Sequence, residues 1–259
     1  GVEFIENEGP VFKNPISNST DIKNLNHFDP ESLDYVYKAV NNIKNSLPEE
    51  IPLIGFCGSP WTLAAYSIEG RSSKDFEKTL SFLESNQDDV HYLLTKYTDA
   101  CFLYLRKQVQ SGADVIQIFD SWANLLTKED LIEYSFNYIN SLISALKLDP
   151  ITKNIPVIIF ARNPKCNIEE LINTSADCIS LFWSMNNLNF EVAKNKVAIQ
   201  GNLDPKVLLE TDEIIKRETY KILEKFKEYP GYIFNLGHGI TPNVSPDKIK
   251  YLTNIVREY

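Results

Sequence analysis

Six short apolar runs recur along the chain, and longer segments with interleaved apolar and charged residues separate them. Runs of about four to eight apolar residues without alternation are typical of strands that are buried on both faces, as in parallel sheets. The sequence therefore predicts six buried strands. The runs are Ile51–Phe56, Ala113–Phe119, Ile155–Phe160, Asp177–Trp183, Lys196–Gly201 and Gly231–Gly237.

The longer segments carry helical periodicity and helix-start signals. Gln87–Ser111 has apolar residues at spacings of three and four along one face. A second helix is expected after Thr127, because Asp130 follows three residues later in a variant of the capping box. Two more helices are expected in Thr211–Tyr229 and from Ser245 to Leu252, each opening with a capping residue.

Repeated alternation of strand and helix predicts an α/β fold with parallel strands joined by right-handed crossovers. No GxGxxG follows any of the strands, which disfavours a dinucleotide-binding fold. A chain of 259 residues suits a (β/α)8 TIM barrel, which keeps its functional groups at the carboxyl ends of the strands. The polar stretch 14–26 is expected to be a loop or an irregular cover.

Composition and charge exclude several classes of partner. The net charge of −9 argues against nucleic acid, and no apolar window is long enough for a membrane span. The four cysteines form no CxxC pair and no cluster with histidine, so we expect free thiols in the cytoplasm and no metal site. An anionic ligand would require a local positive site within this acidic chain.

His238 is the first candidate for a functional residue. It lies between Gly237 and Gly239 directly after an apolar run. Glycines let a ligand approach the backbone closely, and an imidazole there could donate a hydrogen bond or respond to pH. The other two histidines, His27 and His91, lie in polar surroundings and are expected to be solvated.

Four further residues follow predicted strands. Tyr66 falls within a helix that Ser59 would cap, and a core tyrosine is the main alternative to a ligand contact. Asp120 and Ser121 follow the second strand; they could cap a helix or bind a ligand, and Ser121 lacks the motif of a nucleophile. Asp204, before a proline, is expected to be a helix cap.

Four blocks of this sequence closely resemble the uroporphyrinogen decarboxylase family. They are IPLIGFCGSPWTLAAYSIEG, GADVIQIFDSWA, IQGNLDP and FNLGHGI, in this order. The resemblance implies a (β/α)8 barrel that needs no cofactor and no metal. It also implies an activity, the removal of CO2 from the four acetate side chains of uroporphyrinogen to give coproporphyrinogen in haem biosynthesis. A cytoplasmic homodimer is expected on the same ground.

The resemblance also assigns candidate residues. The family's substrate-binding tyrosine, serine and histidine fall on Tyr66, Ser121 and His238, and an aromatic residue of its cleft falls on Phe119. We expect Tyr66, Ser121 and His238 to form hydrogen bonds with substrate carboxylates. The protonated pyrrole would act as the electron sink when a carboxylate leaves, so the site needs a group that stabilises this charge.

The sequence departs from the family's pattern in two ways. The arginine-rich segment and the aspartate that binds the pyrrole nitrogens have no counterpart here, so the catalytic residues are unassigned. Because the chain also starts at Gly1, we expect a single barrel domain, residues 1–259, truncated at its first βα unit and with little activity alone. In addition, Phe182 stands where the family usually has an acidic residue.

Two other functions remain open. The chain could be a non-catalytic barrel fragment that binds a tetrapyrrole or a partner protein. A cobalamin-linked methyltransferase is a more distant alternative, which the absence of a His-x-Cys pair disfavours.

Overall fold

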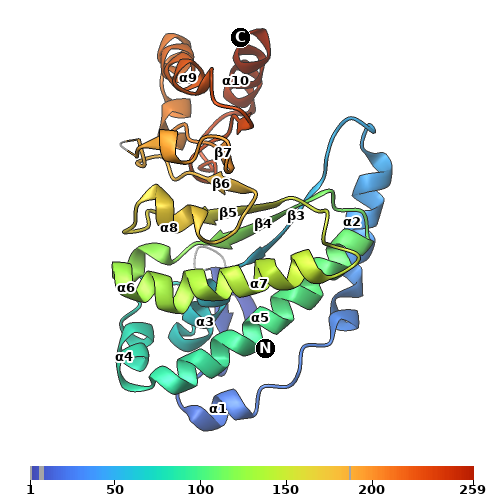
Figure 1. Ribbon diagram of the computed structural model, residues 1–259, viewed down its shortest axis with the longest axis vertical. Coiled ribbons are helices and arrows are strands. Elements are labelled where there is room, and N and C mark those ends of the chain that lie inside the picture. The colour runs from blue at the N-terminus through green and yellow to red at the C-terminus, as the bar shows by residue number, and fades with distance from the viewer. Residues whose placement is uncertain (1, 6–8, 187) are drawn as a thin grey trace.

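A parallel six-stranded sheet forms the centre of the computed structural model, which describes residues 2–5, 9–186 and 188–259 (Figure 1). Each strand pairs in parallel with the next one along the chain. All six apolar runs contain or overlap one of these strands, so the positions of the predicted strands are confirmed, although β3 is not buried on both faces because Ile54 and Phe56 are exposed. They are β3 (Ile54–Gly58), β4 (Val115–Asp120), β5 (Val157–Ala161), β6 (Cys178–Ser180), β7 (Ala198–Gln200) and β8 (Tyr232–Ile233).

The sequential strand order is the order of strands in the wall of a β/α barrel. It confirms the predicted α/β fold with parallel strands. In the described part of the chain, β3 and β8 occupy the two ends of the order, and each pairs with a single neighbour. Because all six strands are parallel, their carboxyl ends lie along one edge of the sheet.

Helices connect the strands and cover the sheet. A short antiparallel hairpin, β1 (Val2–Ile5) and β2 (Gly9–Phe12), precedes them. The helices are α1 (Ser19–Lys23), α2 (Asp34–Ser46), α3 (Pro60–Glu69), α4 (Glu77–Ser85), α5 (Gln87–Gln110), α6 (Lys128–Asp130), α7 (Asn137–Leu148), α8 (Ile168–Ile172), α9 (Asp212–Phe226) and α10 (Pro246–Glu258).

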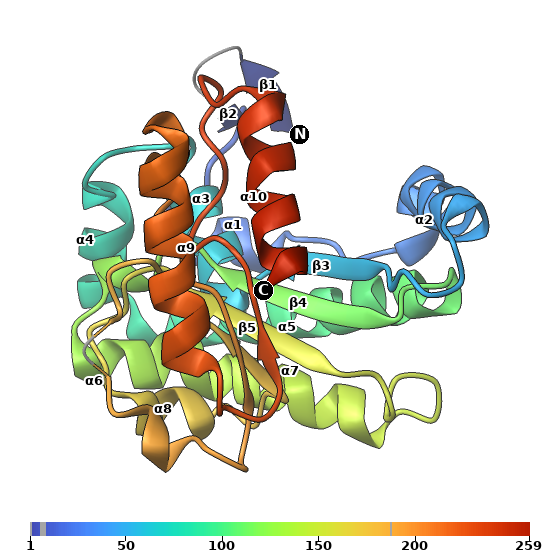
Figure 2. The same ribbon diagram turned by 90° about the horizontal axis from the view of Figure 1, so that it is seen from above.

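The main core lies between the sheet and the long helices. Figure 1 shows α5 and α7 running side by side across the sheet, and Figure 2 shows α9 and α10 as a neighbouring pair. Leu93 and Leu105 of α5 and Ile116 and Ile118 of β4 are fully buried in this core. Burial of one such side chain stabilises the fold by about 1.5–3 kcal/mol, so the apolar pattern that predicts these elements also holds them together.

The helix-start signals are confirmed at most positions. Helix α5 spans the predicted Gln87–Ser111 almost entirely, and Ser59 caps α3 by accepting the Thr62 N–H at 3.0 Å. The Thr127 hydroxyl accepts the Asp130 N–H at 3.1 Å. Asp204 caps the 3₁₀ helix Pro205–Leu209, as expected of a cap before proline.

One prediction about a connecting segment was only partly right, because residues 19–23 are helical and the rest of the stretch 14–26 is irregular. The polar stretch 14–26 contains helix α1, because Asn18 and Asp21 form a reciprocal capping box at its start. Polar side chains that favour loops also satisfy the free backbone N–H groups at the start of a helix. Ile22 of this helix is fully buried and fixes it against the core.

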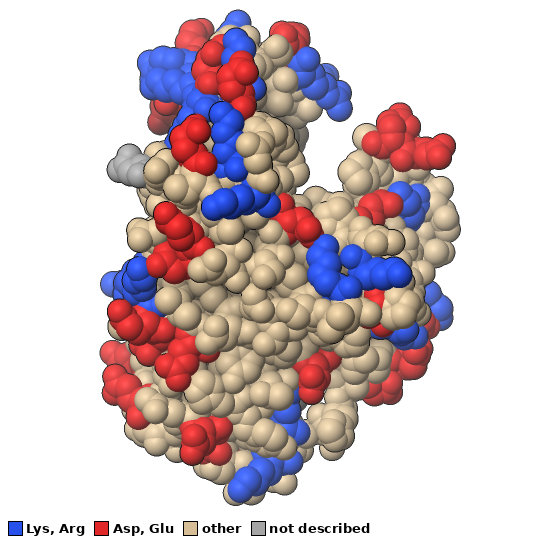
Figure 3. Space-filling view, viewed as in Figure 1, with Lys and Arg blue, Asp and Glu red and all other residues tan. Residues whose placement is uncertain are grey.

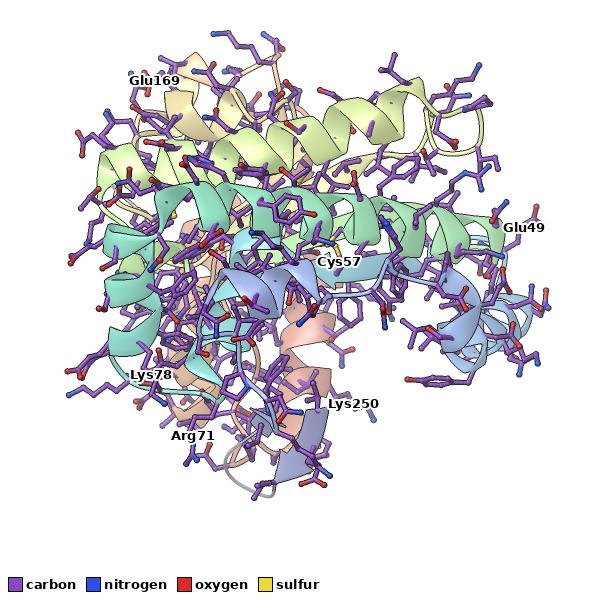
Figure 4. All side chains as sticks on the ribbon, turned by 90° about the horizontal axis from the view of Figure 1, so that it is seen from below. Glu49, Cys57, Arg71, Lys78, Glu169 and Lys250 are labelled. Carbon is purple, nitrogen blue, oxygen red and sulfur yellow. The ribbon has the colours of Figure 1, made fainter. Side chains whose placement is uncertain are left out.

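The surface carries acidic and basic side chains in mixture. Figure 3 shows both signs distributed over the face seen in Figure 1. In Figure 4, Cys57 lies beneath α5 near the middle of the molecule, whereas Glu49, Lys78 and Glu169 lie at the periphery. Among the described residues, no helix has the length and hydropathy required to cross a membrane.

Candidate active site

A cavity of about 440 Å³ opens at the carboxyl ends of the strands. The sheet register explains why its walls meet, since Phe119 pairs with Phe160 and Phe160 with Ser180 in successive parallel strands. Side chains at paired positions of parallel strands project from the same face of the sheet. The cavity is lined by Gln117, Phe119, Ser121, Phe160, Ser180, Asn235, Leu236, His238, Gly239 and Ile240.

Three of the four residues assigned by resemblance line this cavity. Phe119 comes from the end of β4, Ser121 follows that strand, and His238 lies beyond β8. The Ser121 backbone N–H donates to the Thr62 hydroxyl at 2.9 Å, which fixes the turn after β4. The structure thus brings together residues that lie more than a hundred positions apart in the sequence.

Tyr66 is not one of the residues that line the cavity. Its ring packs edge-on against Phe76, with centroids 5.9 Å apart, and against Trp122, with centroids 5.6 Å apart. Trp122 directly follows Ser121 in the chain. Tyr66 therefore lies in an aromatic cluster behind the cavity wall, and its expected contact with a substrate carboxylate stays a prediction.

The imidazole of His238 is partly desolvated by aromatic rings. It lies 6.2 Å from the Phe160 ring and 5.9 Å from the Phe182 ring, measured between centroids. Although His238 as a whole is an exposed residue, this partial shielding of its ring and the positive charge of Arg162 lower the pKa of His238 below its ordinary value. A neutral imidazole keeps one N–H donor and one acceptor nitrogen, so His238 can donate a hydrogen bond to a ligand carboxylate near neutral pH.

The two glycines beside His238 have different roles. A Cβ at Gly237 would lie 2.4 Å from the backbone nitrogen of Trp183, so the close packing of two chain segments requires glycine there. A Cβ at Gly239 would have no atom within 4 Å. Neither glycine has a positive φ. Gly237 thus serves the fold, whereas Gly239 leaves open space at the mouth of the cavity.

Asp120 does not cap a helix, contrary to one of the two sequence interpretations. Its buried carboxylate accepts hydrogen bonds from the hydroxyls of Ser59 at 3.0 Å, Thr62 at 3.1 Å and Ser135 at 2.5 Å. Burial raises the pKa of Asp120, and these hydrogen bonds oppose the shift. The carboxylate ties the end of β4 to the start of α3 and to the π-helical turn Leu131–Phe136, behind the cavity.

Sequence reasoning missed the polar floor of the cavity. The Gln200 amide of β7 donates to the Ser180 hydroxyl at 3.0 Å and lies 3.5 Å from the Gln117 carbonyl oxygen. All three side chains are buried. The available signal was a glutamine within each of two apolar strands, because an unpaired buried amide is costly and polar side chains in such strands need a partner.

The sequence predicts a solvated His91, but in the structure its side chain contacts two tyrosines. Its Nδ1 lies 2.8 Å from the Tyr138 hydroxyl, and its ring stacks on Tyr134 with centroids 4.9 Å apart. A depression of about 560 Å³ surrounds it on the outer face of α5 and α7. This depression lies away from the strand ends, where a β/α fold collects its functional groups. In the described residues, no three His, Cys, Asp or Glu side chains are grouped to hold a metal ion.

The family model and the relatives found by sequence agree on one family. The family model described as Uroporphyrinogen decarboxylase (URO-D) matches residues 1–259. A uroporphyrinogen decarboxylase of Vesicomyosocius okutanii is 42% identical over 100% of this chain and 74% of its own length. A Legionella pneumophila (strain Corby) protein of the same name is 39% identical over 100% of this chain and 73% of its own length.

Solved structures support the fold. A methyltransferase from Methanosarcina mazei superposes with a TM-score of 0.76 at 18% identity, covering 100% of this chain and 75% of that one. At this identity the similarity concerns the fold alone, so it does not favour the methyltransferase alternative. With the whole chain matched by one family and relatives near 40% identity, the protein belongs to the uroporphyrinogen decarboxylase family, the carboxy-lyases that act on uroporphyrinogen in haem biosynthesis.

Proposed function

We propose that the cavity at the strand ends binds uroporphyrinogen and that its acetate side chains lose CO2 there, giving coproporphyrinogen. The shared lining of the cavity by Phe119, Ser121 and His238 is the observation that carries this proposal. Its volume of about 440 Å³ lies within the usual range of small-molecule sites, about 300–1,000 Å³.

The lining offers two kinds of contact to such a substrate. Phe119, Phe160 and Leu236 form apolar walls against which pyrrole rings can pack. Ser121 and His238 offer hydrogen-bond donors to carboxylates. Gly239 leaves space for the macrocycle near the imidazole. Tyr66 would act from behind the wall, by moving its hydroxyl toward a carboxylate or by supporting Trp122.

One observation favours the alternative of binding without turnover. The described residues that line the cavity include neither Asp nor Glu. A protonated pyrrole is stabilised by a nearby anion or by oriented acceptors. The acceptors among the described lining residues are neutral, and they include the side-chain oxygens of Gln117 and Asn235 and the hydroxyls of Ser121 and Ser180. The alternative is therefore a chain that holds the tetrapyrrole in the cavity without decarboxylating it.

The test is anaerobic incubation of the protein with uroporphyrinogen, followed by oxidation and separation of the porphyrins by carboxylate number. Products with seven or fewer carboxylates support decarboxylation. Saturable binding without products supports the alternative. If the protein shows no binding and forms no products, the proposal is overturned.

A matched pair of variants connects the result to the cavity. Gly239→Trp places a large side chain in the open space at the mouth and is expected to abolish binding and turnover. Leu148→Trp adds the same ring at the end of α7, where Leu148 is 83% exposed, and is expected to change neither. If Gly239→Trp and Leu148→Trp have equal effects on binding and turnover, the activity does not depend on this cavity.

A homodimer and a cytoplasmic location are further proposals. The resemblance of the chain to the family supports the first, and sedimentation at several concentrations measures it. The four cysteines are free in the structure, as is usual for proteins of reducing compartments, which supports the second. The chain is proposed to act as a single domain, since one sheet connects β3 to β8.

A further inference from the structure

Arg162 is held close to the cavity by the fold, two residues after the lining residue Phe160. It is the first residue after β5, and its backbone N–H donates to the Asp120 carbonyl oxygen at 3.0 Å. Its guanidinium lies over the Trp122 ring, 5.4 Å from the centroid. Both neighbours lie directly behind the cavity wall, because Asp120 and Trp122 stand on either side of the lining residue Ser121 in the chain.

The charge of this guanidinium is not neutralised by an ion pair. Arg106 and Arg217 form ion pairs with carboxylates, but no such pair joins Arg162 to a carboxylate of the described residues. Its field reaches the cavity, since it contributes to the lowered pKa of His238. In a chain of net charge −9, an unpaired arginine beside a cavity is a local positive site for an anionic ligand.

The contact with Trp122 suits a binding role. A guanidinium stacked on an aromatic ring keeps its N–H groups free in the plane, and these groups match the two oxygens of a carboxylate. Holding the side chain in place before binding reduces the entropy lost when a ligand is bound. The neutral donors Ser121 and His238 lack a permanent charge, so they complement this arginine rather than replace it.

We propose that Arg162 binds a carboxylate of the tetrapyrrole at the rim of the cavity and so selects acidic substrates. This inference rests on the proposed function and adds to it the group that recognises the charge. The carboxylate would accept hydrogen bonds from the guanidinium, while Ser121 and His238 bind the same or a neighbouring acidic side chain.

The test uses uroporphyrin, the stable oxidised form of the substrate, titrated against the protein and followed by tryptophan fluorescence. Arg162→Met is expected to weaken binding by about tenfold or more, the loss of one charge-assisted hydrogen-bonded pair. Arg162→Lys is expected to bind with intermediate affinity, because lysine keeps the charge without the planar fork. Lys165→Met removes the same charge from the same loop at an exposed position and is expected to bind within about twofold of the unmodified chain.

Two readouts separate this role from a structural one. In Arg162→Met the pKa of His238 is expected to rise, and the dependence of uroporphyrin affinity on salt concentration is expected to decrease. Equal affinities of Arg162→Met and the unmodified chain would overturn the inference and leave the proposed function standing. If the unmodified chain does not bind uroporphyrin, the proposed function and this inference both fail.

Discussion

The imidazole of His238 stands nearly perpendicular to the ring of Phe182, with an interplanar angle of 88° and centroids 5.9 Å apart. An apolar ring at this position gives the imidazolium no counter-charge and shields part of it from water, although His238 as a whole is exposed. The arrangement therefore favours the neutral form of His238. Repulsion from the charge of Arg162 lowers the pKa of His238 as well. The folded-state pKa lies below the ordinary value of 6.5, so His238 costs stability as the pH falls below that value.

Replacing Phe182 tests whether its apolar ring helps to lower the pKa of His238. Phe182→Asp is expected to raise the pKa of His238 by about one unit or more, because a carboxylate within a few ångströms stabilises the imidazolium. Nuclear magnetic resonance titration of the three histidines measures it, with His27 as the internal control. Phe182→Leu keeps the site apolar and should leave the pKa of His238 low. An unchanged pKa of His238 in Phe182→Asp would contradict the account.

The glycines on either side of His238 are expected to respond differently to the same substitution. Gly237→Ala forces a Cβ against the Trp183 backbone and should lower the free energy of unfolding by about 1–3 kcal/mol. Gly239→Ala meets open space and should change it by less than about 0.5 kcal/mol. Uroporphyrin affinity should fall in Gly239→Ala if the macrocycle lies against this loop. Denaturant unfolding and titration measure the two effects, and equal losses of stability would refute the assignment.

The buried carboxylate of Asp120 is expected to stabilise the wall behind the cavity. Asp120→Ala leaves the Ser59, Thr62 and Ser135 hydroxyls without their acceptor, so a loss of roughly 1–3 kcal/mol or more in unfolding free energy is expected. Thermal and denaturant unfolding measure this loss. Ser141→Ala, a hydroxyl deletion on the exposed face of α7, is the control and should be nearly neutral. A neutral Asp120→Ala would show that these hydrogen bonds contribute little.

The same carboxylate predicts a pH dependence. Because the pKa of Asp120 is raised in the folded protein, its contribution to stability is greatest below pH 3.8 and is lost as the pH rises through the folded-state pKa. The difference in unfolding free energy between the unmodified chain and Asp120→Asn should therefore become smaller as the pH rises from 3.8 through the folded-state pKa of Asp120. If this difference becomes larger instead, the hydrogen bonds to Asp120 lower its pKa by more than burial raises it.

A variant of Tyr66 can show whether this residue binds the substrate or only packs in the aromatic cluster. Tyr66→Phe keeps the ring contacts with Phe76 and Trp122 and removes only the hydroxyl. We expect the melting temperature to change little and the uroporphyrin affinity to fall by about threefold to tenfold, as for the loss of one hydrogen bond. A loss of stability with unchanged affinity would place Tyr66 in the core alone.

Much of the fold could be predicted from the sequence, for a physical reason. A strand buried on both faces is largely apolar, and each of the six strands overlaps an apolar run, although β3 exposes Ile54 and Phe56 on one face. Helix α5 was equally clear, since its apolar face is continuous. The segment with α1 was misjudged because asparagine and aspartate favour both loops and helix starts, and only the reciprocal bonds of Asn18 and Asp21 decide between them.

The site was only partly predictable. Ser121 and His238 stand out because they follow strands. Asp120 was recognised as notable, but its three hydroxyl donors come from separate segments, and no local pattern indicates such a long-range cluster. The contacts of Gln117 with Gln200 and of Arg162 with Trp122 also join distant parts of the chain. The packing of Gly237 against Trp183 depends on tertiary structure in the same way.

The most direct test of the central claim is to locate the tetrapyrrole on the protein. Histidine resonances are followed by nuclear magnetic resonance while uroporphyrin is added to the unmodified chain. We predict a saturable shift of the His238 signal, with His27 unchanged and with His91, on the outer face of α5, also unchanged. A shift confined to His91, or no shift of His238 at saturating uroporphyrin, would contradict the assignment of the cavity as the substrate site.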